Sequence, residues 1–181
     1  MKKIFCLVLC MIFVFSFAAC GKDSGKKIEH SIDIEYYAKL GQINDLEYKL
    51  GDSIENTKSQ LNQTTDDHGE SNYYDYTSGD YTVMTDGAVC ACYKTDDEAA
   101  GITHIVKYGD AYGFTVGDVS TQIRDVMSGL GYDATEREAT RDDIFFLPAG
   151  ADMTVLEYKI KDTTLLFVFQ EHALSATLIS K

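Results

Sequence analysis

The feature that most constrains this chain is an order of predicted elements that occurs twice. Two similar motifs, Leu50-Gly51-Asp52 and Val116-Gly117-Asp118, each stand directly before a predicted helix. Asp52 and Asp118 suit the caps of these helices, and Glu55 completes a capping box in the first, because carboxylates accept hydrogen bonds from free backbone N–H groups. Predicted strands joined by turns follow each helix. The order therefore predicts an internal repeat.

Short turns join the predicted strands within each half. Asp86-Gly87 is suited to a tight hairpin, because both residues tolerate positive φ. Sequential short connections imply an antiparallel sheet, and neither half is long enough to bury a strong core alone. We predict an α+β fold, a tandem repeat of a helix followed by about four antiparallel strands, which forms one sheet with the helices on one face. The first αβ repeat covers residues 34–110 and the second covers residues 111–181, with a strand in each half near 73–77 and 144–147.

This arrangement resembles the fold of the β-lactamase inhibitor proteins, which is a tandem repeat of such units. It is also similar to the single unit of small outer-membrane assembly lipoproteins. The resemblance spans roughly residues 44–181 and rests on the motifs at 50–52 and 116–118 with the hairpins behind them. It implies a sheet used for binding, but not β-lactamase as the target. The chain departs from the inhibitors because it lacks tryptophan, and because Cys90 and Cys92, two apart on one strand, are poorly placed for disulfides. We interpret both as small buried apolar residues.

The first nineteen residues differ from the rest of the chain. Lys2 and Lys3 precede an apolar run at 4–19, which is shorter than the ~20 residues of a membrane span and has the pattern of an export signal. The run ends in Phe17-Ala18-Ala19-Cys20, which resembles the lipobox of bacterial lipoproteins. The resemblance implies a signal peptide at 1–19 and a diacylglyceryl lipid on Cys20 that anchors the chain stably. The small, polar and charged residues that follow predict a flexible tether at 20–33. An ordinary secretory signal and an uncleaved anchor remain alternatives.

Charge and aromatic residues indicate the kind of partner. The net charge of −13 opposes nucleic acid and favours a basic protein or a cation. Large aromatic side chains on a sheet face suit partner binding, although cross-strand packing explains them equally well. The candidate binding residues are the tyrosines around the first strands, with two phenylalanines at the matching place in the second half: Tyr73, Tyr74, Tyr76, Tyr81, Phe145 and Phe146.

The sequence contains no nucleophile motif, phosphate loop or zinc-protease motif. The acidic loop at 66–70 fits no calcium pattern that we can name, so we predict no metal and no cofactor beyond the lipid. We therefore predict a lipid-anchored extracytoplasmic binding or scaffold protein, not an enzyme, which binds another envelope protein at the cytoplasmic or the outer membrane. The alternatives are an envelope small-ligand carrier or hydrolase, or an accessory subunit of an envelope assembly complex.

Overall fold

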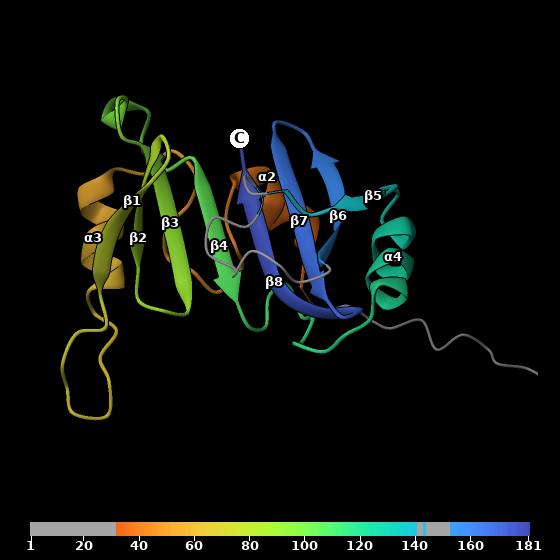
Figure 1. The fold of residues 1–181 in the computed structure, drawn as a ribbon. Coiled ribbons are helices and arrows are strands. Elements are labelled where there is room, and N and C mark those ends of the chain that lie inside the picture. The colour runs from red at the N-terminus through yellow and green to blue at the C-terminus, as the bar shows by residue number, and fades with distance from the viewer. Residues whose placement is uncertain (1–31, 141–142, 144–152) are drawn as a thin grey trace, which may run out of the picture.

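The computed structural model describes residues 32–140, 143 and 153–181. Within this part of the chain, eight strands form one antiparallel sheet in the order β1-β2-β3-β4-β8-β7-β6-β5 (Figure 1). The strands are β1 (Tyr74–Ser78), β2 (Tyr81–Thr85), β3 (Val89–Lys94), β4 (His104–Tyr108), β5 (Thr135–Glu138), β6 (Met153–Ile160), β7 (Thr163–Gln170) and β8 (Ala173–Ser180). The α-helices are α2 (Ile34–Leu40), α3 (Ile54–Leu61) and α4 (Ser120–Gly129), and a short 3-10 turn, η1, covers Glu98–Ala100.

Each face of the sheet carries its own apolar cluster. On one face, the buried residues of the three helices pack with alternate residues of the strands into the main core; the helical members are Ile34, Ala38, Leu61, Ile123 and Met127. The opposite face carries a second cluster, whose buried members in the described part of the chain all lie on strands: Val83, Cys90, Cys92, Val106, Met153, Val155, Leu166, Val168, Ala176 and Leu178. The sheet is therefore buried on both faces at its centre, which explains its nearly continuous apolar strands.

The predicted tandem repeat is wrong. The described residues form a single sheet with three helices, and they do not divide into two units of one helix and four strands. Helix α2 precedes the first motif in the chain, yet it packs on β6 and β7 near the other end of the sheet. The sequence of a short amphipathic helix does not show which strands the helix will pack against. The order of elements along the chain therefore suggested two separate repeats, and the structure does not contain them. The predicted boundary at 110 and 111 falls in the connection between β4 and α4.

The two repeated motifs are alike only in their loops. In each motif, the glycine N–H and the aspartate C=O form backbone hydrogen bonds with a single distant residue. This residue is Ile102 for Gly51 and Asp52, and Leu174 for Gly117 and Asp118. Each aspartate carboxylate accepts from the backbone N–H three residues before it, and neither caps its helix as predicted. The two motifs are therefore similar because the loop before each helix has the same hydrogen-bonding pattern.

The helix caps are supplied by neighbouring residues. Ser53 Oγ accepts from Asn56 N at the start of α3, 3.3 Å away. At the start of α4, the Gln122 side chain accepts from Val119 N at 3.1 Å. The predicted caps were one residue too early, because the aspartates close the preceding turns instead.

Several predictions concern residues outside the described part of the chain. These are the signal peptide, Cys20 and the tether up to residue 31, and also the strand near 144–147 with Phe145 and Phe146. Among the residues that are described, no helix is both long and apolar enough to cross a membrane.

Candidate binding face

Three of the predicted tyrosines share the sheet face that lies opposite the helices. Tyr74 and Tyr76 alternate along β1, and the register with β2 places them beside Thr85 and Val83. Tyr81 of β2 lies on the same face, where it is the cross-strand neighbour of Ser78. Tyr76 and Tyr81 pack against the second apolar cluster, as does Tyr108 of β4. We call Tyr74, Tyr76, Tyr81 and Tyr108 the tyrosine face.

The tyrosine face becomes more exposed toward the edge of the sheet. The rings of Tyr74 and Tyr76 are stacked, with centroids 6.1 Å apart and planes 22° apart. Tyr74 is 55% exposed, whereas Tyr76 and Tyr81 are half-buried. Tyr81 also meets the imidazole of His104 edge to face, at 5.1 Å between centroids. A ring that is exposed and at the same time held by a neighbouring ring is suited to contact a partner with little loss of side-chain entropy.

Tyr73 is separated from the other candidates. It precedes β1 by one residue, and a step of one residue turns a side chain to the opposite face of a strand. Its ring packs beside the main core, its hydroxyl donates to Asp75 Oδ2 at 2.9 Å, and Lys58 Nζ lies 5.1 Å from its centroid. Tyr73 therefore contributes to packing at the helix side of the sheet.

The hydroxyl groups of Tyr76 and Tyr108 remain protonated at physiological pH, because the pKa of each is raised. Burial is the main cause that raises the pKa of Tyr76 and of Tyr108 well above the ordinary value. The Tyr108 hydroxyl is buried and has no hydrogen-bond partner among the described residues. These phenols are therefore neutral groups, which can donate one hydrogen bond and offer a large apolar ring.

Cys90 and Cys92 lie beneath this face as free thiols, 3% and 0% exposed, which confirms that they are small buried residues. Burial raises the pKa of Cys90 to about 11 and also raises that of Cys92, so neither forms a thiolate near neutral pH. Cys92 pairs across the strands with His104, whose Nδ1 shares a 2.9 Å hydrogen bond with Thr103 Oγ1. Across the described ranges, no three His, Cys, Asp or Glu side chains are grouped so as to hold a metal ion.

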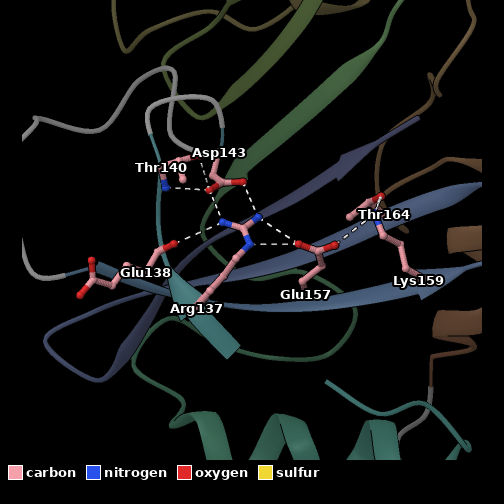
Figure 2. A network of polar contacts seen from close by, with 7 residues as sticks. All are labelled: Arg137, Glu138, Thr140, Asp143, Glu157, Lys159 and Thr164. Atoms are coloured by element: carbon pink, nitrogen blue, oxygen red, sulfur yellow. Dashed lines mark hydrogen bonds and ion pairs between the residues drawn. The ribbon is translucent and has the colours of Figure 1, made fainter. Parts of the chain in front are cut away.

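A polar network at the other end of the same face was not predicted from the sequence (Figure 2). All five N–H groups of Arg137, on β5, donate hydrogen bonds. Nη1 and Nη2 reach the Asp143 carboxylate at 2.5 and 2.8 Å, and Nε and Nη2 reach Glu157 Oε2 at 3.1 and 3.0 Å. The fifth bond goes to the carbonyl of Glu138 at 3.2 Å. Arg137 therefore has no N–H group left for a ligand.

The two carboxylates of this network are held in their charged form. Burial alone would raise the pKa of Asp143, but hydrogen bonds from Arg137 and Thr140 outweigh it and lower the pKa below the ordinary value. The pKa of Glu157 is also lowered, because hydrogen bonds from Lys159 and Arg137 outweigh its burial. The network joins β5 and β6 to Thr140 and Asp143, and we interpret it as structural. The alternation of charge at 136–138 is visible in the sequence, but the pairing with Asp143 is not.

No family model matches the chain, and comparison with curated proteins and with solved structures gave no match either. The resemblances to lipoproteins and to β-lactamase inhibitor proteins therefore remain predictions from the sequence.

Proposed function

We propose that this chain is a lipid-anchored binding or scaffold protein of the bacterial envelope. Cys20 carries the anchor, and the tyrosine face binds another envelope protein. The observation that supports this function best is the stacked pair of Tyr74 and Tyr76, because it leaves an aromatic ring 55% exposed beside a buried apolar cluster. Tyrosine is enriched among the residues that contribute most to binding at protein interfaces.

The surroundings of the pair also favour a protein partner. Tyr76 packs against the second apolar cluster, in which Val83 and Cys92 are both 0% exposed, and the ring of Tyr74 stacks on that of Tyr76. The two rings are therefore ordered before a partner arrives. The net charge of −13 favours a partner with a basic surface and opposes nucleic acid. A partner would cover the exposed rings at the β1 end, because the centre of this face is already buried.

Site-directed photo-crosslinking in the native host tests the binding face. A photoreactive phenylalanine analogue replaces Tyr74 in one variant and Tyr36 in a matched control. Both tyrosines are 55% exposed, but Tyr36 is on helix α2, at the helix side of the sheet. We expect a discrete crosslinked protein at position 74 and none at position 36. A blank lane at position 74, or the same products at both positions, would overturn the proposal.

The anchor is tested separately with the substitution Cys20→Ser. We expect the wild-type chain in the membrane fraction, with a lipid mass on a peptide that begins at Cys20. The variant should lose the lipid and the processed N-terminus. A wild-type chain with an unmodified Cys20, or with a start elsewhere, would contradict the anchor but would leave the binding face to be judged by its own experiment.

A further inference from the structure

The two edges of the sheet differ in how they are protected. An exposed edge strand offers unpaired backbone N–H and C=O groups, and proteins usually protect it with charged residues, proline or a bulge. At one edge, β5 has only four residues, and three of them are charged: Glu136, Arg137 and Glu138. At the other edge, β1 reads Tyr-Asp-Tyr-Thr-Ser and has one charge, no proline and an unbroken five-residue register with β2. The β1 edge is therefore open to pairing.

No described strand pairs with the outer side of β1. The side chains along this edge alternate, with Tyr74 and Tyr76 on the tyrosine face and Asp75 on the opposite side. An added strand would place one side chain beside each of these rings and the next beside Asp75. Because cross-strand neighbours interact directly, the edge specifies a chemical pattern for the strand that it accepts.

The charge of Asp75 determines which residue an added strand should carry beside it. The Asp75 side chain is 52% exposed, and its nearest cation, Lys58, lies 3.7 Å away and is itself 52% exposed. Glu70 and Asp80 flank the strand in the sequence and are both exposed. An incoming Lys or Arg at the position beside Asp75 would be attracted, whereas an acidic residue there would be repelled.

We infer that the β1 edge binds an extended segment of a partner protein as a ninth strand, and that apolar and basic residues alternate in this segment. The inference rests on the proposed function and names the mode and chemistry of the contact. Main-chain hydrogen bonds supply affinity, and the rings of Tyr74 and Tyr76 with the carboxylate of Asp75 supply selectivity. A second copy of this chain fits less well, because two bodies with a charge of −13 repel one another.

Peptide binding to the full chain in detergent tests this inference. The probe is the synthetic peptide Thr-Lys-Val-Arg-Val-Lys-Thr, and its counterpart with Glu in place of each Lys and Arg is the charge control. Hydrogen exchange measured by mass spectrometry should show added protection of 74–78 with the basic peptide, beyond that given by β2, and no added protection with the acidic one. Protection of 74–78 that rises with protein concentration before any peptide is added would show pairing with a second copy and would overturn the inference.

Charge-reversal variants make the test specific. Asp75→Lys should weaken the basic peptide at least tenfold, and Asp75→Asn should weaken it about threefold. The matched control Asp162→Lys, in a turn where the aspartate is 77% exposed, should leave affinity within twofold. Melting temperatures establish that each variant is folded. Equal weakening by Asp162→Lys would show general charge attraction, and binding without protection of 74–78 would place the contact elsewhere; both results overturn the inference.

The two proposals fail in different ways. A protein crosslinked at position 74, together with an unprotected β1 edge, would leave the tyrosine face as a binding surface and remove strand addition. No crosslink and no protection would remove both.

Discussion

The hydroxyl of Thr163, at the start of β7, donates to the backbone carbonyl of Ala38 in α2 at 2.9 Å. The two residues are 125 positions apart. The hydroxyl is also 2.8 Å from the carbonyl of Ile160, and Thr163 is 3% exposed. This contact holds an N-terminal helix against the hairpin of the last strands, so both ends of the described chain stabilise one sheet.

Replacement of Thr163 by Val should lower the free energy of unfolding by about 1 kcal/mol. Val keeps the shape but removes a buried hydrogen bond, and Ala38 O retains its bond from Gly41 N. Thr163→Ser keeps the hydroxyl and is the control for that bond. Urea unfolding followed by circular dichroism measures both variants. An unchanged stability in Thr163→Val, together with a loss in Thr163→Ser, would show that the methyl group matters, and not the hydrogen bond.

The sequence predicted local elements well because their causes are local. Asp86-Gly87 forms a hairpin as predicted: Gly87 has a φ of 90°, and Asp86 Oδ1 accepts from the N–H groups of Ala88 and Val89. The hairpin predicted around this dipeptide corresponds to β2 and β3. The prediction grouped Tyr73 with Tyr74, Tyr76 and Tyr81, but only the last three share a face. Patterns of period two report the local backbone directly.

The sequence did not reveal contacts between distant segments. Nothing in the residues of α2 shows that it packs under β6 and β7, and nothing near Arg137 identifies Asp143 as its partner. The uncovered sheet face expected from the sequence is buried at its centre, so the candidate surface shrinks to the β1 end. These features depend on tertiary packing, which a pattern along the chain does not encode.

Gly101 should tolerate no side chain. A Cβ at this position would lie 2.5 Å from the carbonyl oxygen of Asp52, and the backbone has φ 68° and ψ −156°, a region used almost only by glycine. Gly101→Ala should therefore lower stability by about 3 kcal/mol, from strain and overpacking together. Gly79 also has a positive φ but has nothing within 4 Å, so Gly79→Ala should cost only about 1 kcal/mol. Similar losses in both variants would contradict the close approach at Gly101.

Stability should depend on pH through the carboxylates around Arg137. The pKa of Asp143 is lowered from its ordinary value of 3.8, so its contribution is present above that value and is lost as the pH falls through the folded-state pKa. Asp143→Asn should cost about 2 kcal/mol at pH 7, less than a fully buried pair because the Arg137 side chain is 33% exposed. The difference from wild type should shrink as the pH falls below about 4.

Urea unfolding between pH 3 and pH 7 measures this dependence. The control Asp162→Asn, in an exposed turn, should differ from wild type by less than about 0.5 kcal/mol throughout. A deficit of Asp143→Asn that stays constant down to pH 3 would show that its cost arises from lost packing and not from charge.

Cys90 and Cys92 should resist alkylation while the protein is folded. Only the thiolate reacts, and burial raises the pKa of Cys90 to about 11 and also raises that of Cys92. Iodoacetamide at pH 8 should therefore leave both unmodified over hours and modify both in 8 M urea, as read by peptide mass spectrometry. The variant Ser59→Cys, on the exposed side of α3, supplies an internal comparison that should react within minutes. If Cys90 reacted as fast as that exposed cysteine in the folded protein, the sheet face beneath Tyr76 would open readily, and the ordered support that we assign to the tyrosine face would be lost.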